Sequence, residues 1–187
     1  DGGHAFNLNI VAIRSKQRDQ AKDVFDDLIT CTYREEKNGR WITKSWQGTT
    51  DPGVLALMRP ELYNTKDGTA IIKSPQQMRG AYQIDWHRQK YEALCQRKPI
   101  TIYRDNNRDK VLNMDPDCEH TGLFGCNIHK AGRDSAHISG ETWVWSAGCI
   151  VFKREQDFNE LMDLAHLQIE LNPRWPKTFT LTLLDEQ

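Results

Sequence analysis

The sequence predicts a mainly β fold with one long helix, and three patterns carry this prediction. Apolar and polar residues alternate along several short segments, as they do in strands with one buried face. Turn-forming pairs such as Asn38-Gly39 separate some of these segments, as in β-hairpins. One segment near the C-terminus instead repeats its apolar residues every three or four positions. With 187 residues and neither linker nor internal repeat, the chain is expected to form a single domain, residues 1–187.

The expected strands follow one another along the chain with turns between them. The second and third flank the Asn38-Gly39 turn, and Asp51-Pro52-Gly53 supplies another turn. Residues 59–80 are expected to form a long connection that contains one short strand. The expected strands are 6–13, 28–33, 40–46, 69–73, 82–84, 100–103, 123–129, 150–152 and 179–183.

The helix is expected between residues 158 and 169. Its apolar residues fall on one face at spacings of three and four, and Asn172-Pro173 ends it. Acidic side chains near its start suit the positive end of the helix dipole. Core packing explains this face without a functional role. The apolar residues are Phe158, Leu161, Met162, Ala165 and Ile169.

Composition restricts the class of partner. The chain carries 25 Lys and Arg against 26 Asp and Glu, a formal net charge of −1, so no strong field attracts nucleic acid or anionic lipid. Residues 101–187 are the more acidic part, with 9 Lys and Arg against 14 Asp and Glu. No apolar segment approaches the roughly 20 residues of a membrane span. The chain begins at Asp1 without a signal peptide, and its composition does not predict an oligomeric state.

The five cysteines leave at least one thiol unpaired in a monomer. None lies in a Cys-x-x-Cys pair, which argues against a structural zinc site, and no metal or other cofactor is predicted. In an oxidising compartment one or two disulfides could form among Cys31, Cys95, Cys118 and Cys126. Cys149 is expected to stay free.

The strongest functional signal is the run Trp145-Ser146-Ala147-Gly148-Cys149-Ile150, downstream of Asn127-Ile128-His129. A free thiol is mostly protonated near neutral pH, and an adjacent imidazole can take its proton or hold the thiolate. Gly148 would let a substrate carbonyl approach and backbone N–H groups converge on an oxyanion. We therefore expect Cys149 Sγ and a ring nitrogen of His129 to lie within about 4 Å of each other. A buried, inert cysteine is the alternative.

This run resembles the catalytic motif of the L,D-transpeptidases, the YkuD-like family, in which a histidine lies upstream of a Ser/Thr-His-Gly-Cys turn. The resemblance covers residues 122–152, with a looser counterpart in residues 49–53. It implies an L,D-transpeptidase-like β-sandwich or barrel with one long helix after the catalytic cysteine. It also implies that Cys149 is the nucleophile, that His129 is its base, and that Ser146 and Gly148 form the turn that presents the thiol.

The chain departs from the family pattern at two positions. Ala147 stands where the family has a histidine before Gly-Cys, and Val151 stands where an arginine often follows the cysteine. The sequence as a whole resembles a divergent branch of this family that is carried by phages and bacterial mobile elements. Nearby side chains could replace the lost imidazole, hold a substrate carboxylate or stack on a sugar. The residues expected to bind substrate are His137, Arg133, Lys130, Trp143 and Trp145.

The resemblance implies acyl transfer on peptidoglycan stem peptides through a thioester on Cys149. An amine would resolve the thioester in transpeptidation or amino-acid exchange, and water would resolve it in cleavage. The periplasm or cell wall is then the expected site of action. Two alternatives remain open: a catalytically inactive cell-wall-binding, phage or envelope module on the same fold, favoured by Ala147 and Val151, and a cysteine protease or amidase that acts on proteins.

Two further patterns receive a simple interpretation. Residues 105–109 place oxygen side chains at alternate positions, as calcium loops do, but Lys110 and Pro116 stand where such a loop has Gly and Glu. A solvated turn is therefore the simpler interpretation. His87 and His120 lie in polar contexts and are expected to be exposed.

Overall fold

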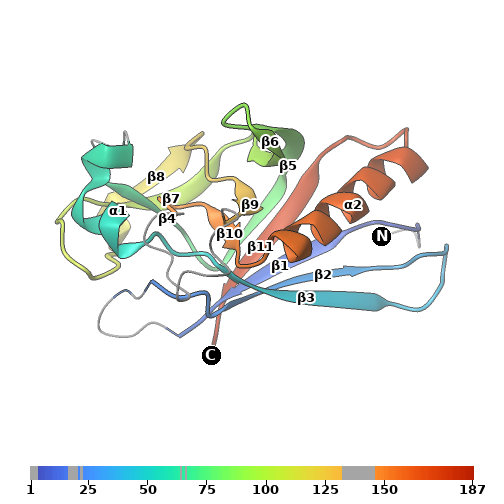
Figure 1. Ribbon diagram of the computed structural model, residues 1–187, viewed down its shortest axis with the longest axis horizontal. Helices are drawn as coiled ribbons and strands as arrows, with labels where there is room; N and C mark the ends of the chain where they lie inside the picture. The colour runs from blue at the N-terminus through green and yellow to red at the C-terminus, as the bar shows by residue number, and fades with distance from the viewer. Residues whose placement is uncertain (1–3, 17–20, 22, 64, 66, 132–145) are drawn as a thin grey trace.

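A computed structural model describes residues 4–16, 21, 23–63, 65, 67–131 and 146–187 (Figure 1). Within this part of the chain, eight strands close into a barrel in the order β1-β11-β5-β6-β9-β10-β3-β2, and three form a separate sheet, β4-β7-β8. The barrel strands are β1 (Asn9–Arg14), β2 (Asp27–Tyr33), β3 (Ile42–Thr49), β5 (Gln76–His87), β6 (Tyr91–Gln96), β9 (Ile128–Lys130), β10 (Ile150–Phe152) and β11 (Phe179–Asp185). The small sheet holds β4 (Thr69–Ile72), β7 (Ile100–Asp105) and β8 (Glu119–Gly122).

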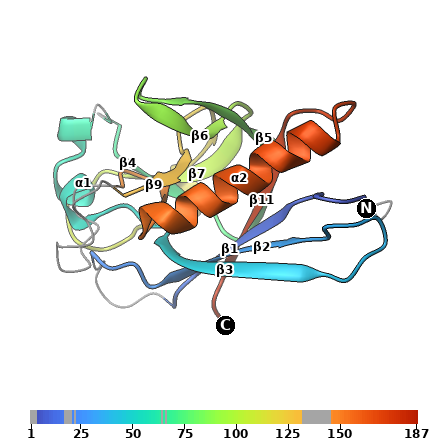
Figure 2. The same ribbon diagram turned by 45° about the vertical axis from the view of Figure 1, so that its right-hand side comes forward.

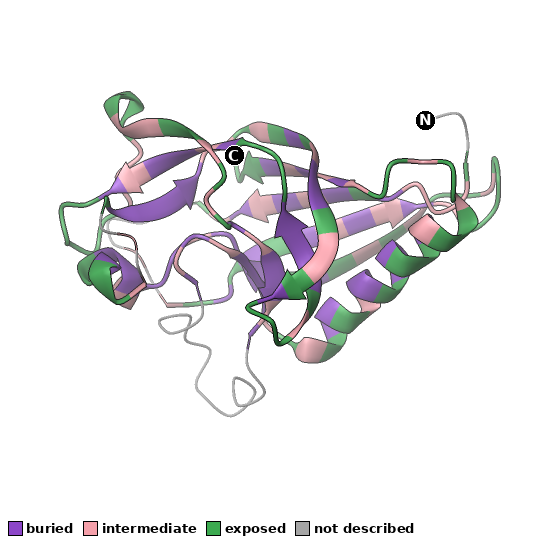
Figure 3. Ribbon diagram, turned by 90° about the horizontal axis from the view of Figure 1, so that it is seen from above, coloured by how far each residue is buried: buried purple, intermediate pink, exposed green. Residues whose placement is uncertain are grey.

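The prediction of a mainly β fold with one long helix is confirmed. The helix is α2 (Glu155–Leu171), and Figures 1 and 2 show it running obliquely beside the barrel. It contacts β9 and β10. Buried and exposed residues alternate along it, as Figure 3 shows. The buried face, with Phe158, Leu161 and Ala165, belongs to the same apolar cluster as the inward side chains of the barrel. The buried Gln168 side chain also accepts a hydrogen bond from the Leu8 backbone N–H at 2.9 Å.

Two strands of the structure, β6 and β8, were not predicted, and the strand expected at residues 123–129 is mostly absent. Only β9, at its C-terminal end, is a strand. Gly125 adopts a positive φ of 72°, and the Gln96 side chain takes over the hydrogen bonds of this segment. Its Oε1 accepts from the backbone N–H groups of Phe124 and Cys126, and its Nε2 donates to the Gly122 carbonyl. A side chain therefore replaces the ladder that a strand would need.

The small sheet lies at the other end of the molecule from the C-terminal half of α2, next to the short helix α1 (Val54–Met58) (Figure 1). Two 3₁₀ helices, η1 (Pro60–Tyr63) and η2 (Pro116–Cys118), complete the described elements at this end. Thr69 at the start of β4 donates its hydroxyl to the Ala56 carbonyl at 2.6 Å, which ties α1 to the sheet. None of the described helices is long and apolar enough to cross a bilayer.

A buried charged cluster, here the Arg14 cluster, fixes the turn at residues 49–53. It consists of Arg14, Asp27, Thr50 and Asp51. Arg14 is 1% exposed, and its Nε lies 2.8 Å from Asp51 Oδ1. Its Nη2 donates to the Ile72 carbonyl at 2.9 Å, while Asp27 Oδ2 accepts from the Thr50 hydroxyl at 2.7 Å. The cluster therefore joins β1, β4 and the residues 49–53.

Candidate active site

The turn that precedes Cys149 is held by its own serine. Ser146 is completely buried, and its hydroxyl donates to the Cys149 carbonyl at 2.9 Å and accepts from the Gly148 N–H at 3.3 Å. The Ser146 carbonyl in turn accepts a hydrogen bond from the Gly53 N–H at 2.9 Å. The two segments that the family resemblance singled out, residues 146–149 and 49–53, are therefore in direct contact.

Gly148 has a steric role that the sequence did not indicate. Its φ is +111°, and a Cβ at this position would lie 2.4 Å from the Ala70 carbonyl oxygen of β4. Glycine is therefore needed for close approach of the chain to β4. The Gly148 N–H is also engaged by Ser146, so the oxyanion donor that remains in the turn is the Cys149 N–H. This group has no hydrogen-bond partner among the described residues.

The Cys149 thiol is partly exposed and lies immediately before β10. It packs against an apolar cluster of Phe25, Ala131 and Val151. Its Sγ donates to the Gly125 carbonyl at 3.5 Å. Burial raises the pKa of the Cys149 thiol above its ordinary value, while the Asn127 backbone N–H and the more distant Arg88 act in the opposite direction. Cys149 therefore rests as a thiol.

His129 lies on β9, the parallel neighbour of β10, and pairs in register with Val151. Cys149, two residues before Val151, is therefore on the same face of this pair as His129. His129 is 5% exposed, and its Nδ1 lies 2.8 Å from the Lys130 carbonyl. This contact requires a proton on Nδ1 and leaves Nε2 as the acceptor. Burial, reinforced by the neighbouring His87, lowers the pKa of His129 to about 3, so the ring is neutral at pH 7.

The expectation that Cys149 Sγ and a ring nitrogen of His129 lie within about 4 Å of each other stays a prediction, because no hydrogen bond among the described residues joins the two groups. Cys149 Sγ bonds to the Gly125 carbonyl and His129 Nδ1 to the Lys130 carbonyl. Among the described residues, His129 Nε2 has no hydrogen-bond partner. His129 and Cys149 lie on the same face of the β9–β10 pair, but their reactive atoms, Nε2 and Sγ, are not hydrogen-bonded to each other. Such loose geometry is common in sites without a bound substrate.

His87 belongs to this site, and the expectation that it is exposed was wrong. It is 6% exposed, and its ring stacks on that of His129 with centroids 4.4 Å apart. The Asn127 side-chain amide lies 3.0 Å from His87 Nδ1, and Asn127 Oδ1 accepts from the Gln96 N–H at 2.9 Å. Burial lowers the pKa of His87 to about 4, with the cations Arg88 and Lys90 adding to the shift. We call His87, Asn127 and His129 the imidazole cluster.

Tyr91 and Lys130 border the imidazole cluster. The Tyr91 hydroxyl donates to the Lys130 carbonyl at 3.4 Å, close to the bond that His129 makes there. The Lys130 ammonium forms an ion pair with Glu155 at the start of α2 and lies 4.8 Å from the Tyr91 ring centroid. Lys130, which was expected to bind substrate, is thus already engaged inside the protein.

Arg88 is a cation close to this site that has no partner among the described residues. It is exposed at the tip of the β5–β6 hairpin, where Arg88 and Gln89 have φ values of 49° and 57°. The Lys90 N–H closes this two-residue turn by donating to the His87 carbonyl at 3.0 Å. In the described part of the chain no hydrogen bond or ion pair engages the Arg88 guanidinium, and its field lowers the pKa values of Cys149, His87 and His129. The sequence does not predict this turn because it contains neither Gly nor Asn.

The remaining predicted substrate-binding residues, Arg133, His137, Trp143 and Trp145, lie outside the described residues. The other cysteines are free thiols, and burial raises the pKa of Cys126 well above its ordinary value. His120, like His87, was expected to be exposed, and it is.

The acidic segment at residues 105–109 bonds mainly to its own loop. Asp109 Oδ1 accepts from the Val111 N–H at 2.7 Å, and Asp105 Oδ2 accepts from the Asn113 N–H at 3.1 Å. These contacts match the interpretation as a turn. Over the residues that the structure describes, no group of three or more His, Cys, Asp or Glu side chains is placed to hold a metal ion.

Comparison with known proteins adds no relative. No protein-family model matches the chain, and neither the curated proteins nor the solved structures contain a significant match.

Proposed function

We propose that this protein is a cysteine-dependent acyl-transfer enzyme that acts on peptidoglycan stem peptides, with an L,D-transpeptidase-like fold. The main support is the neutral, buried ring of His129. Its Nδ1 is fixed on the Lys130 carbonyl, and its Nε2 is unpartnered in the described structure on the strand face that also carries Cys149. Nucleophilic catalysis by a thiol requires a base of this kind, held in one tautomer and within reach of the sulfur.

The resting protonation states favour general-base activation over a preformed ion pair. The pKa of Cys149 is raised and that of His129 lies at about 3, so thiol and imidazole are both neutral near pH 7. In the first step His129 Nε2 takes the thiol proton while Sγ attacks the amide carbonyl. The imidazolium then returns this proton to the leaving amine as the C–N bond breaks, which leaves a thioester.

Two further groups would support this reaction. The Cys149 backbone N–H can donate to the tetrahedral oxyanion, because it has no other partner among the described residues. His87, stacked on His129 and held by Asn127, fixes the plane of the ring. The thioester is then resolved by an amine or by water.

Arg88 is the residue best suited to recognise the substrate's carboxylate. Stem peptides carry free carboxylates, and a guanidinium binds such a group through two parallel hydrogen bonds. Arg88 is exposed, is unpartnered in the described structure and acts electrostatically on Cys149 and both buried histidines. It would take the place in recognition that the sequence assigned to Lys130 or Arg133.

The decisive experiment incubates the protein with purified peptidoglycan and reads the muropeptides by mass spectrometry. We expect the wild type to cleave or exchange stem-peptide residues, and Cys149→Ala to abolish the change. Cys118→Ala is the matched control, because Cys118 is also a partly exposed free thiol but lies on η2. Unchanged muropeptides with wild-type protein would refute the proposal, and cleavage of a protein substrate in the same preparation would favour a cysteine protease.

One observation favours a second candidate, an inactive cell-wall-binding module on the same fold. Cys149 Sγ donates its hydrogen bond to the Gly125 carbonyl, and the pKa of the Cys149 thiol is raised. Alkylation of the thiol separates the two candidates. In an enzyme, His129→Ala slows labelling of Cys149 near neutral pH, because the ring accepts the proton. In a binding module, Cys149 is labelled at the same rate as Cys118, and His129→Ala does not change this rate.

A further inference from the structure

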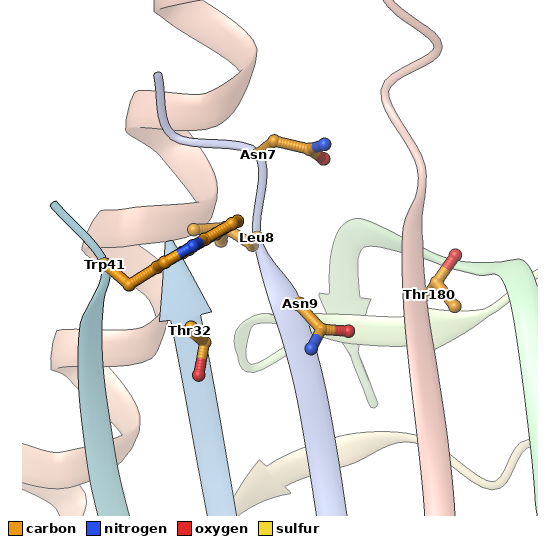
Figure 4. Close-up of a pocket in the computed structure, with 6 residues that line it drawn as sticks. All are labelled: Asn7, Leu8, Asn9, Thr32, Trp41 and Thr180. Carbon is orange, nitrogen blue, oxygen red and sulfur yellow. The ribbon is translucent and has the colours of Figure 1, made fainter. Parts of the chain in front are cut away.

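A groove lies on the outer face of the barrel, where β1, β2 and β11 are neighbours. Its volume is about 560 Å³. Figure 4 shows the Trp41 side chain reaching across β2 toward Leu8, with Thr32, Asn9 and Thr180 on the strands that follow. The lining residues, here the Trp41 groove, are Asn7, Leu8, Asn9, Thr32, Trp41 and Thr180.

The walls of the groove are fixed before any ligand binds. The segment that carries Asn7 is tied down on both sides, by the Leu8 N–H to Gln168 of α2 at 2.9 Å and by the Phe6 N–H to the Arg34 carbonyl at 2.7 Å. Thr32 shares a hydroxyl hydrogen bond of 3.0 Å with Thr43 on β3. A rigid wall lowers the entropy cost of binding.

Trp41 provides an exposed aromatic surface. It is 52% exposed, although a tryptophan normally buries most of its ring. The Arg34 guanidinium stacks on the ring at 4.0 Å from its centroid, which orients the indole and covers one of its faces. With about half of its surface exposed, the side chain keeps area for contact with a ligand.

The lining is neutral. None of its six side chains is ionisable, and the amides of Asn7 and Asn9 and the hydroxyls of Thr32 and Thr180 can both donate and accept hydrogen bonds. Thr180 Oγ1 already accepts from the Gly80 N–H at 3.0 Å, which leaves its hydroxyl proton free to donate. A charged ligand would find no counter-ion among these residues.

Hydroxyl groups continue from the groove along the same face of the sheet. Thr32 pairs with Thr43 and Asn9 with Thr32, and the next row places Ser45 beside Thr30. Because residues in register project from the same face of the sheet, the first row is polar across β3, β2 and β1, whereas the second is polar on β3 and β2 and ends at Val11 on β1. An extended neutral ligand could therefore follow the rows beyond the groove.

We propose that the Trp41 groove binds a neutral oligosaccharide. A pyranose ring has a face of C–H groups that packs on the indole and a rim of hydroxyls that pairs with amides and hydroxyls. An aromatic platform with neutral groups that both donate and accept matches this chemistry. The proposal does not depend on the reaction at Cys149. If that reaction is also correct, the groove would hold a glycan strand while the thiol acts on its peptide.

The test is titration of the full chain with three neutral tetrasaccharides, in which isothermal calorimetry and tryptophan fluorescence measure binding. The probes are a β-1,4-linked N-acetylglucosamine tetramer, cellotetraose and maltotetraose. We expect at least one to bind, and Trp41→Ala to weaken it about tenfold or more. Trp86→Ala is the matched control, because Trp86 is 60% exposed but lies on β5, and it should change the affinity by less than about twofold.

Two additions keep the outcome clear. Asn9→Asp, an exposed substitution in the groove, should also weaken binding, and circular dichroism checks that each variant is folded. Cys149→Ala protein should bind the sugar as the wild type does, so a failed acyl-transfer assay leaves this result intact. Absence of binding by all three sugars, or binding that Trp41→Ala leaves unchanged, overturns the proposal. So does a dimer in sedimentation that Trp41→Ala dissociates.

Discussion

The two buried polar clusters of this protein solve opposite problems. The Arg14 cluster is charged, and its groups bond to one another: Asp27 accepts from the Ser15 N–H and from Thr50, and Arg14 contacts Asp51 and the Ile72 carbonyl. The imidazole cluster is neutral at pH 7, and His129 Nε2 has no hydrogen-bond partner among the described residues. A cluster whose groups bond to one another stabilises a turn, whereas an unpartnered acceptor on the strand face that also carries a thiol is available for chemistry.

The comparison also shows how a cluster can be buried without becoming inert. The Asn127 side-chain nitrogen contacts His87 Nδ1, and its Oδ1 accepts from the Gln96 N–H. Stacking of His87 on His129 fixes the orientation of both rings. These contacts restrain orientation but use no bonding capacity of Nε2. In the Arg14 cluster four side chains, one more than in the imidazole cluster, hold strands β1 and β2 and a turn, and they bond chiefly to one another and to the neighbouring backbone. We therefore expect the two clusters to respond differently to mutation.

The largest effect is expected from removing the base. His129→Ala should lower the turnover of muropeptides by about 10²- to 10⁴-fold, the usual contribution of general acid–base catalysis. His166→Ala is the control, because His166 is half-exposed on α2 and pairs with Glu92, and it should leave the rate unchanged. Steady-state rates measured by mass spectrometry check both. If His129→Ala keeps wild-type turnover, the imidazole cluster is structural like the Arg14 cluster.

Removing the cation of the other cluster should affect stability instead. Arg14→Met removes the buried cation that pairs with Asp51 and donates to the Ile72 carbonyl. A broken buried pair typically costs about 3–5 kcal/mol, and the 22% exposure of the Asp51 side chain places this loss at the lower end of the range. The free energy of unfolding in urea measures this loss. Arg79→Met is the matched control, since Arg79 is exposed, and it should change stability by less than about 0.5 kcal/mol. A small loss for Arg14→Met would show that this cluster is held by other contacts.

The sequence could identify the thiol and one imidazole of the site, but not the second imidazole, His87. Cys149 and His129 were found because a thiol in a small-residue turn and an upstream imidazole form a local pattern. His87 was missed because its neighbours are polar and because the hairpin that buries it turns on Arg88 and Gln89, which give no turn signal. Without that hairpin, β6 is not predicted and nothing brings His87 to His129. The fold was predicted as far as alternation could show it, whereas the Gln96 contacts that end the expected strand at 123–129 depend on distant residues.

Lowering the pH should change the stability contributed by the two clusters in opposite directions. Below pH 6.5 the unfolded chain protonates its histidines, while His87 and His129 stay neutral in the folded state down to pH about 4 and about 3. The unfolded state then binds more protons, so stability falls as pH drops. Asp51 acts in the opposite direction, because burial raises its pKa to about 6 from 3.8, and the folded state therefore binds more protons than the unfolded state between these values.

The two histidines outweigh Asp51 and Asp105, the two carboxyl groups whose pKa values burial raises, so we expect a net loss of about 2 kcal/mol between pH 6.5 and 4.5. In the double variant His87→Gln/His129→Gln the contributions of the two imidazoles are absent, and the raised pKa values of Asp51 and Asp105 should let stability rise over the same interval. Urea unfolding at a series of pH values gives both slopes. Parallel slopes in the two proteins would mean that the imidazoles are not buried as described.

The smallest effect concerns recognition by Arg88. Arg88→Asn removes the guanidinium but keeps a residue that tolerates the left-handed backbone of the turn. If Arg88 holds a carboxylate, KM for a stem peptide should rise about tenfold, and kcat should change little. Lys90→Gln controls for the loss of a positive charge on the same hairpin. A substrate whose terminal carboxylate is converted to an amide should bind equally weakly to wild type and variant. If Arg88→Asn raises KM for the amide as strongly as for the acid, the guanidinium stabilises the hairpin over the imidazole cluster, and recognition lies with other residues.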